Sequence, residues 1–394
     1  LFFTEVASEA ELHSFSERTM MLPLVNKAAG PWWEVHAVST ADNSKAMLFF
    51  RVEHACADGV ALTQVLSKLC TSLDGSPLPA AAYSKQPKPK ADFCALLCAA
   101  LKSVCKYAVL PFGRFDSDLP ITPTLCERQA GLMYNGRRRL VQVPPHSLNN
   151  IKQVKVAAGG QTTVNDVVFA AFAGAVRRYC VQAAGWGGHS IQLDSTTLAR
   201  ALVPVSFPRP AGTPLINDWT FVNVDLPLGE ASSVGRLESA HAQFSKLKGS
   251  PEAAIARLAV AVNSGNPTAM FGAIGQATFS RHTTVFSNVP GPSAPILIAG
   301  EQVLEIWPLF PNLIPQVICI SYAGKMYATF TLDEALVTKP QLLSELYLDE
   351  LRALATAYGV DPNDDTPPAA PPPKQASPTP AISGTGKGSS VELV

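Results

Sequence analysis

The sequence has 394 residues, enough for two domains with sizeable hydrophobic cores. Hydrophobic residues make up 47% of the chain, charged residues only 16%, and the formal net charge is zero. A neutral chain gives no indication of nucleic-acid binding, and its low charge suits contact with lipid. The 8 cysteines show neither a CxxC pair nor a Cys/His metal-ligand spacing, so we predict a reducing compartment, no metal and no cofactor.

The first residues give weak local signals. The chain begins at Leu1 without a basic leader, so no signal peptide is predicted, and we expect the sequence to be a fragment that lacks its true N-terminus. Residues 10–30 carry a weak helical pattern. Residues 31–38 (PWWEVHAV) then predict a strand with two aromatic side chains for core packing.

Residues 53–59 (EHACADG) join a predicted strand to a predicted helix. The strand covers residues 46–52 (AMLFFRV), and the helix shows apolar residues at helical spacing at Leu62, Val65, Leu66 and Leu69. His54 is the side chain best suited to exchange a proton near neutral pH. Asp58 stands where a helix N-cap belongs, and Gly59 gives the backbone freedom to turn. The alternative interpretation is that His54 has only a structural role and that Asp58 only caps the helix.

Residues 93–112 form an apolar stretch with only two charges, Lys102 and Lys106, four positions apart on one helical side. Two lysines near the middle of a membrane span would be costly, so we predict either an interfacial helix or a buried core helix. Residues 111–130 are rich in turn formers and predict a linker. Arg137 to Arg139 follow and either contact a phosphate or form a solvated strand edge.

The clearest predicted helix runs from Val164 to Cys180, with the helical period held over four turns. Thr163 and Asp166 have the spacing of a capping box, which gives Asp166 a local structural role. Nothing local explains Asn165. Strands are predicted at 201–207, 219–226, 283–289, 317–322 and 325–332, with helical stretches near 233–262 and 339–357.

The order of these elements predicts an α/β layered domain. Residues 286–292 (FSNVPGP) read as a strand broken by a rigid Pro-Gly-Pro turn, with Asn288 at its mouth. From Asp361 onward Pro, Ser and Gly dominate, so the tail is predicted to be disordered.

Several of these segments together resemble the wax ester synthase/diacylglycerol acyltransferase (WS/DGAT) family, within the CoA-dependent acyltransferase superfamily. His54 to Gly59 resembles the HxxxDG motif, with Glu53 where the family usually has a further His. Residues 31–36 resemble its PLW-E-xH segment, residues 163–167 its ND motif and residues 288–292 its NVPGP segment. The resemblance covers roughly residues 10–358, and it implies a further strand and helix before Leu1.

The resemblance implies a two-domain chloramphenicol acetyltransferase-like sandwich with the active site in a channel between the domains. We therefore predict an N-terminal acyltransferase domain at 1–111, a crossover linker at 112–143 and a C-terminal domain at 144–360. The disordered tail then covers residues 361–394.

The resemblance also implies an O-acyltransferase in which His54 is the general base. A fatty alcohol or diacylglycerol hydroxyl then attacks acyl-CoA directly, and acyl-CoA is a substrate, not a cofactor. No covalent intermediate is predicted, because the chain has no G-x-S-x-G elbow. Asp58 and Gly59 would shape the turn, and Asn165 and Asn288 would polarise the thioester carbonyl.

Further expectations concern substrate contact and location. Glu53, Asp166 and Asn288 are predicted to contact substrate, and Asp58 is expected to be held through an Arg from the other domain. The expected location is the cytosolic side of a membrane, the endoplasmic reticulum or a lipid droplet if the source is eukaryotic. Residues 93–112 would make the peripheral contact. The oligomeric state is left open.

Two alternatives remain. The first is a non-catalytic lipid- or CoA-binding protein of the same fold, since a carboxylate at Glu53 would raise the pKa of the His54 imidazole and weaken it as a base. The second is an acyltransferase with another alcohol acceptor, as in hydroxycinnamoyl-type enzymes. Their DFGWG motif is absent from this sequence.

Overall fold

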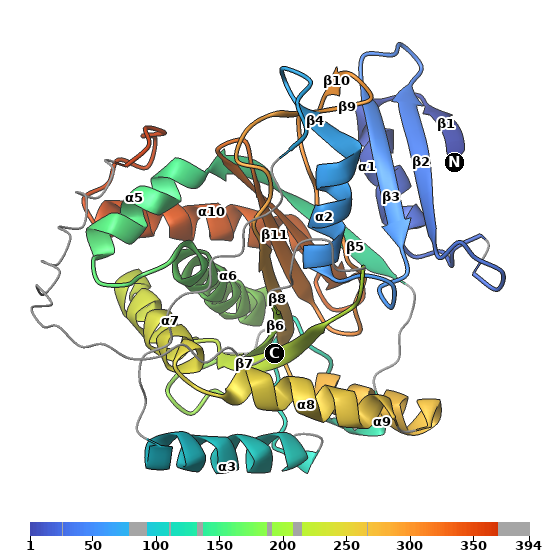
Figure 1. Cartoon of the computed structure of the whole chain (residues 1–394). Helices are drawn as coiled ribbons and strands as arrows, with labels where there is room; N and C mark the ends of the chain where they lie inside the picture. Colours follow the sequence, from blue (N-terminus) through green and yellow to red (C-terminus); the bar gives the residue numbers. More distant parts are fainter. Residues whose placement is uncertain are drawn as a thin grey trace, which may run out of the picture.

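The computed structural model describes residues 1–25, 27–78, 93–109, 112–131, 137–186, 191–207, 215–265 and 267–368. Figure 1 shows a large mixed sheet with helices over it and a smaller N-terminal sheet beside it. The α/β class predicted from the order of elements is confirmed.

The N-terminal sheet has three strands in the order β1-β2-β3. They are β1 (Phe2–Val6), β2 (Trp33–Thr40) and β3 (Ala46–Val52), and α1 (Glu9–Thr19) packs on them. The predicted strand at 46–52 is confirmed to the residue, whereas the helix expected over 10–30 ends at Thr19. Val6, Leu12 and Val38 form the small core between helix and sheet.

Helix α2 (Gly59–Leu69) follows the turn, as predicted, and its apolar face is only partly buried. Leu62 and Leu69 are exposed, and the buried residues are Val60 and Ala61 in the first turn. The apolar period locates the hydrophobic side of a helix, but the helix buries whichever side the neighbouring elements contact. After α2 the short β4 (Cys70–Ser72) pairs with β9 (Ile296–Ile298), which ties the N-terminal region to the C-terminal one.

The large sheet has six strands in the order β5-β12-β11-β8-β6-β7. Its strands are β5 (Arg138–Ser147), β6 (Arg200–Ser206), β7 (Trp219–Asp225), β8 (Thr284–Val289), β11 (Gln316–Tyr322) and β12 (Lys325–Asp333). The pairs β11–β8 and β6–β8 are parallel and the others antiparallel. All five predicted strands of this half are confirmed within about two residues at each end.

Four helices cover one face of this sheet (Figure 1). They are α5 (Leu148–Ala158), α6 (Val164–Trp186), α7 (Ser233–Lys248) and α10 (Pro340–Ala357). The predicted apolar side of α6 is buried along its whole length and forms the centre of the main core. The Thr163–Asp166 capping box is confirmed, because each residue's side chain accepts the other's backbone N–H.

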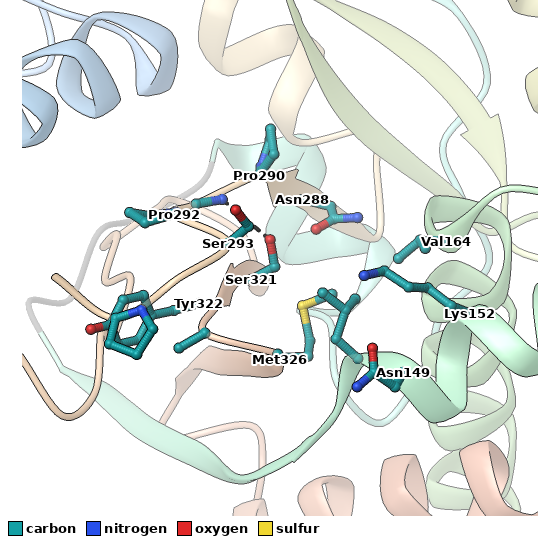
Figure 2. Close-up of a pocket in the computed structure, with 15 residues that line it drawn as sticks. Asn149, Lys152, Val164, Asn288, Pro290, Pro292, Ser293, Ser321, Tyr322 and Met326 are labelled. Atoms are coloured by element: carbon teal, nitrogen blue, oxygen red, sulfur yellow. Dashed lines mark hydrogen bonds between the residues drawn. The ribbon is translucent and has the colours of Figure 1, made fainter. Parts of the chain in front are cut away.

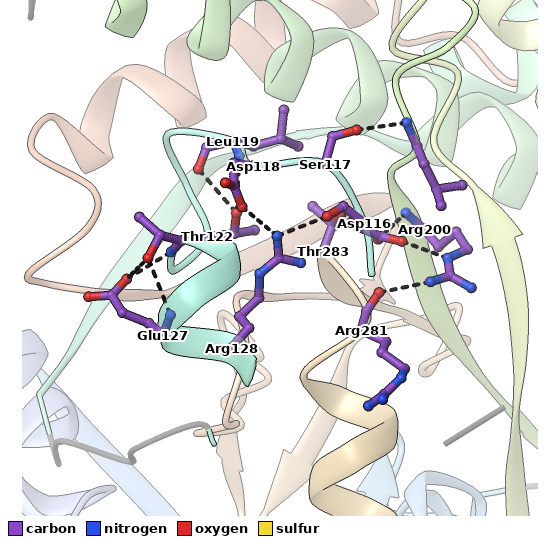
Figure 3. Close-up of polar contacts among 12 residues, drawn as sticks. Asp116, Ser117, Asp118, Leu119, Thr122, Glu127, Arg128, Arg200, Arg281 and Thr283 are labelled. Carbon is purple, nitrogen blue, oxygen red and sulfur yellow. Dashed lines mark hydrogen bonds and ion pairs between the residues drawn. The ribbon is translucent and has the colours of Figure 1, made fainter. Parts of the chain in front are cut away.

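The predicted linker is firmly docked on the C-terminal domain (Figure 3). The Asp116 carboxylate is buried and accepts hydrogen bonds from Arg200 Nε at 2.6 Å and Thr283 Oγ1 at 2.7 Å. Burial raises the pKa of Asp116, although the Arg200 guanidinium acts in the opposite direction. The segment also contains a helix that the sequence reading missed, α4 (Leu125–Ala130), with a capping box at Thr124 and Glu127.

Strand β5 crosses the predicted boundary at 143/144, so the C-terminal sheet begins inside the predicted linker. The solvated edge considered from sequence is wrong for Arg138, whereas the alternative phosphate contact stays a prediction. Arg138 is buried and bonds Asp333 Oδ2 at 3.0 Å, and Arg139 pairs with Glu17 and Glu334. The contact with Glu17 fastens α1 to the large sheet.

The beginning of the predicted tail is ordered. Asn150 donates from Nδ2 to the carbonyl oxygen of Asp361 at 2.8 Å, and Gln153 donates to that of Thr366 at 2.7 Å. The ordered chain therefore extends to residue 368, and the rest of the predicted tail lies outside the described residues.

Three further helices lie along one edge of the molecule (Figure 1). They are α3 (Phe93–Val109), α8 (Glu252–Ser264) and α9 (Thr268–Phe279). The helix predicted at 93–112 is confirmed, whereas α9 was not predicted. Among the described residues, no helix has both the length and the hydropathy needed to cross a bilayer.

Candidate active site

The turn that carries His54 is held at both ends. At its start the Glu53 backbone N–H donates to the carbonyl oxygen of Trp32 at 2.8 Å, and the Glu53 carboxylate pairs with Lys27 at 3.0 Å. The Cys56 N–H closes the turn on the Glu53 carbonyl at 2.9 Å. Glu53 is thus half-buried beside His54, and its carboxylate forms an ion pair with Lys27 at the surface.

His54 is half-buried between two aromatic side chains of the C-terminal domain. The Trp219 ring stands edge-on to the imidazole at 5.6 Å between centroids, and the Phe310 ring does so at 5.1 Å. Burial lowers the pKa of His54 below 6.5, and this effect outweighs the Asp58 and Glu53 carboxylates, which act to raise it. Glu53 acts to raise this pKa, as predicted, but desolvation of the imidazolium is the larger effect. His54 is a neutral imidazole at neutral pH, the form that accepts a proton.

Asp58 is buried at the start of α2 and both carboxylate oxygens accept backbone hydrogen bonds. Oδ1 accepts from Ala61 N–H at 3.0 Å, which is the N-cap contact that the sequence predicts. Oδ2 accepts from Asp218 N–H at 2.9 Å. Arg257 donates to the Asp218 carboxylate at 2.8 Å and 2.5 Å. The arginine expected to contact Asp58 therefore contacts Asp218, whose backbone N–H bonds Asp58.

Gly59 is the first residue of α2 and does not have a positive φ, so the predicted need for backbone freedom is wrong here. A Cβ at Gly59 would lie 3.5 Å from Cγ2 of Val289, the last residue of β8. A side chain there would make an ordinary packing contact with the end of β8, next to Asn288.

The structure brings Asn165 and Asn288 together. Asn288 Nδ2 donates to Asn165 Oδ1 at 3.5 Å, across the gap between the end of β8 and the first turn of α6. Both residues are half-buried. This use of the Asn165 carbonyl leaves its amide N–H groups as donors for another oxygen.

Asp166 lies on the opposite side of the same helical turn and is fully buried. Its Oδ2 accepts from Thr163 N–H at 2.9 Å and lies 2.9 Å from His241 Nδ1 on α7. The contact with substrate predicted for Asp166 stays a prediction, and its observed contacts are those of a residue that fixes the start of α6.

A pocket of about 620 Å³ opens beside Asn288 (Figure 2). Its walls come from α5, the Pro-Gly-Pro turn and the ends of β11 and β12, and Lys152 and Asn149 on α5 are among its polar side chains. His54 does not line it. The pocket and the His54 turn therefore both adjoin the end of β8, the pocket at Asn288 and the turn, through Gly59, at Val289.

The Pro-Gly-Pro turn depends on its glycine. A Cβ at Gly291 would come within 2.2 Å of the carbonyl oxygen of Ser321, and the Gly291 N–H donates to Ser321 Oγ at 3.2 Å. The turn is thereby fixed against the end of β11, which forms one wall of the pocket.

Sequence reasoning missed three residues of this region: Trp219, Phe310 and Lys152. Trp219 begins a predicted strand, but no local pattern shows that it faces His54. Phe310 and Lys152 carry no sequence signal at all. In the described part of the chain, no three His, Cys, Asp or Glu side chains are grouped as a metal site requires.

Comparison with solved structures identifies the fold. The chain superimposes on the wax ester synthase/diacylglycerol acyltransferase of Marinobacter aquaeolei VT8 with a TM-score of 0.60 and 21% identity, over 91% of this chain and 80% of that one. It also matches the cyclization-docking bidomain of EpoB from Sorangium cellulosum with a TM-score of 0.51 and 14% identity, over 90% of this chain and 69% of that one. The predicted two-domain fold, which the chain shares with these structures, is confirmed.

Sequence comparisons show similarity to one family. The WS/DGAT C-terminal domain matches residues 216–355. A probable diacylglycerol O-acyltransferase of Mycobacterium tuberculosis H37Rv is 24% identical over 75% of this chain and 65% of its own length. A putative diacylglycerol O-acyltransferase of the same organism is 29% identical over 51% of this chain and 40% of its own length. The chain is thus similar to WS/DGAT proteins over these residues, and it spans less than two thirds of the length of these relatives.

Proposed function

We propose that the protein transfers a long-chain acyl group from acyl-CoA to the hydroxyl of a fatty alcohol or diacylglycerol, with His54 as general base. The observation that carries this proposal is the state of His54: a half-buried imidazole between Trp219 and Phe310, whose pKa burial holds below 6.5. A base that is neutral at working pH is available in every molecule.

The proposed reaction needs only one base, because the proton that His54 accepts is later returned to the leaving group. His54 accepts the hydroxyl proton while the hydroxyl oxygen bonds to the thioester carbonyl carbon. The tetrahedral intermediate collapses as the C–S bond breaks, and the imidazolium returns the proton to the CoA thiolate. The surrounding aromatic rings exclude water, which would otherwise compete with the alcohol.

The other residues of the site position the His54 turn or polarise the thioester carbonyl. Asp58 fixes the turn through Ala61 and Asp218, and its carboxylate faces backbone N–H groups, so it does not act as an acid of a triad. Asn165 is our candidate for the thioester carbonyl oxygen, because its amide N–H groups remain available beside Asn288. The pocket next to this pair would receive part of a substrate.

The names of the relatives support the substrate class. The mycobacterial proteins are named diacylglycerol O-acyltransferases, and the Marinobacter protein is named for both wax ester synthesis and diacylglycerol acylation. We extend these activities to this chain as a proposal, with either alcohol as acceptor. The predicted location on the cytosolic side of a membrane or on a lipid droplet belongs to the same proposal.

A non-catalytic binder of acyl-CoA or lipid is the second candidate. The argument for this candidate is that Glu53 stands where the family usually has a His. Its carboxylate would raise the pKa of His54 and so weaken the imidazole as a base. The lowered pKa of His54 removes that argument. Loss of the neighbouring His alone does not deprive the site of its base.

The test is acyl transfer from palmitoyl-CoA to hexadecanol or diacylglycerol, followed by release of the CoA thiol. His54→Ala should reduce the rate by about 10²–10⁴-fold, the usual contribution of a general base. His13→Ala, which removes an imidazole on α1 outside the site, is the matched control and should stay near the parent rate. Parent turnover indistinguishable from buffer would favour the binder, and a His54→Ala rate within a few-fold of the parent would exclude His54 as base.

A further inference from the structure

The pocket beside Asn288 contains a charged side chain, Lys152 of α5. Among the described residues that line the pocket, Lys152 is the one with a charge, and none is Asp or Glu. Figure 2 shows the half-buried Lys152 side chain reaching into the pocket, with its terminal nitrogen directed toward Asn288 and Met326. The Lys152 ammonium group forms no hydrogen bond or ion pair with the described part of the chain. Its donors are therefore available to an anionic group of a ligand.

The rest of the pocket wall is largely apolar. Leu148, Val164 and Met326 contribute aliphatic side chains to it. Ser321 Oγ accepts the Gly291 N–H at 3.2 Å, so the Ser321 hydroxyl proton remains free for donation. The pocket therefore suits a ligand that has a weakly polar arm and an anionic group.

No acidic residue of α5 neutralises this cation, because α5 contains Lys152 and Lys155 but neither Asp nor Glu. The segment 361–368 brings Asp365 to the start of α5. There the Asp365 carboxylate accepts a hydrogen bond from Ser147 Oγ, and Asp365 does not line the pocket. The charge that faces the pocket is thus positive.

The two substrates of the proposed reaction differ in charge. A fatty alcohol and a diacylglycerol are uncharged, whereas the CoA part of acyl-CoA carries a diphosphate and a 3′-phosphate on a pantetheine arm. We propose that the pocket holds the CoA part of the acyl donor and that Lys152 binds one of its phosphates. A lysine ammonium group is a common phosphate ligand in proteins. This inference rests on the proposed function, and it assigns the pocket to the donor and not to the acceptor.

The position of the pocket agrees with this assignment. Asn288 lines it and bonds Asn165, the candidate for the thioester carbonyl oxygen. A donor whose phosphate lies at Lys152 therefore presents its thioester at the asparagine pair, with the pantetheine arm along the apolar wall. His54, which contacts the acceptor hydroxyl in the proposed reaction, does not line the pocket. Donor and acceptor would thus approach the reaction centre from different sides.

The direct test is calorimetric titration of the full chain with free CoA. Lys152→Gln should raise the Kd of CoA about tenfold, the effect of losing one charge-assisted contact. Lys152→Arg keeps the charge and should recover most of the affinity. Lys246→Gln is the matched control, because Lys246 is an exposed lysine of α7 that does not line the pocket, and its Kd should equal that of the parent.

A second variant tests the same pocket without a change at Lys152. Ser293 lines the pocket at an exposed position, so Ser293→Asp adds a carboxylate to the wall. Repulsion of the phosphates should raise the Kd of CoA about tenfold. This variant decides the question if Lys152→Gln does not fold by circular dichroism, and an unchanged Kd would then contradict the proposal.

Truncated donors identify the group that Lys152 binds. Dephospho-CoA lacks the 3′-phosphate, and pantetheine lacks all phosphates. If Lys152 binds the 3′-phosphate, Lys152→Gln and the parent should bind dephospho-CoA equally. If Lys152 binds the diphosphate, the variant should bind dephospho-CoA about tenfold more weakly than the parent. In acyl transfer, Lys152→Gln should raise the KM for palmitoyl-CoA about tenfold at unchanged kcat and leave the KM for palmitoyl-pantetheine at the parent value.

Two results would overturn the proposal. One is an equal Kd of CoA for Lys152→Gln, Lys246→Gln and the parent. The other is a rise in the KM for palmitoyl-pantetheine or for the acceptor in Lys152→Gln, because Lys152 would then act on a part of the substrates that has no phosphate.

The same measurements separate this inference from the proposed function. CoA binding that depends on Lys152, without acyl transfer by the parent, would leave the pocket assignment standing and reject the reaction. Acyl transfer by the parent that Lys152→Gln does not alter at any concentration of palmitoyl-CoA would reject the pocket assignment and leave the reaction standing.

Discussion

The Asp58 carboxylate accepts a hydrogen bond of 2.9 Å from the backbone N–H of Asp218, and this contact joins the His54 turn to the strand that carries Trp219. Arg257 holds the side chain of the same Asp218. His54 and one of the aromatic rings beside it are thus positioned by one buried carboxylate.

We expect Asp58→Asn to lower the free energy of unfolding by about 1–3 kcal/mol, because an amide nitrogen would face a backbone N–H that now has an acceptor. Urea unfolding measures the change. Asp74→Asn alters an exposed turn carboxylate and should shift stability by no more than about 0.5 kcal/mol. Equal small effects of the two substitutions would contradict the assigned role of Asp58.

The pH dependence of kcat/KM should show the lowered pKa of His54. The protonated imidazole cannot act as a base, so activity should fall as the pH drops through a value below 6.5. Glu53→Gln removes a carboxylate that stabilises the imidazolium, and the acid limb should therefore move to still lower pH. Glu5→Gln on β1 is the control. A limb above 6.5, or one that Glu53→Gln moves upward, would contradict this assignment.

The asparagine pair can be tested by kinetics. If Asn165 stabilises the oxyanion, Asn165→Ala should lower kcat about 10²–10³-fold with little change in KM. Asn288→Ala should have a smaller effect that is not additive with the first, because Asn288 orients Asn165 through their hydrogen bond. Asn363→Ala, at an exposed position that does not line the pocket, is the control. Unchanged kcat in Asn165→Ala would leave the pair a purely structural role.

Acid sensitivity should come partly from His146 in β5. Burial lowers the pKa of His146 to about 4 from 6.5, so between these values the unfolded chain binds a proton that the folded chain does not. Stability is therefore complete above 6.5 and declines as the pH falls toward 4, by about 2–3 kcal/mol. His146→Phe, which keeps a ring against Tyr347, should flatten this slope in urea unfolding, apart from the contribution of His54 in the same direction. An unchanged slope would contradict the assignment.

The Pro-Gly-Pro turn offers a test of packing. Gly291→Ala places a Cβ against the Ser321 carbonyl and should lower the free energy of unfolding by about 1–3 kcal/mol. Gly272→Ala in α9 meets nothing within 4 Å and should be neutral or stabilise by about 0.5–1 kcal/mol. Thermal unfolding of the two variants provides the comparison, and similar midpoints would contradict the close approach of Gly291.

The sequence by itself determined the secondary-structure elements and singled out His54. The strand at 46–52, the strands of the large sheet and the capped start of α6 follow from local periodicity and capping, which depend on neighbours along the chain. His54 and Asp58 were found because a motif is a local pattern. The helix α9 was missed because its apolar residues show no helical period that burial would impose.

The tertiary structure alone decided how these parts act. That α2 buries its first turn, that Arg257 contacts Asp218, and that Trp219 and Phe310 desolvate His54 all depend on contacts between residues far apart in the chain. The direction of the His54 pKa shift is the clearest case. The sequence shows the neighbouring carboxylates, whereas the larger effect, burial, exists only after the domains have packed together.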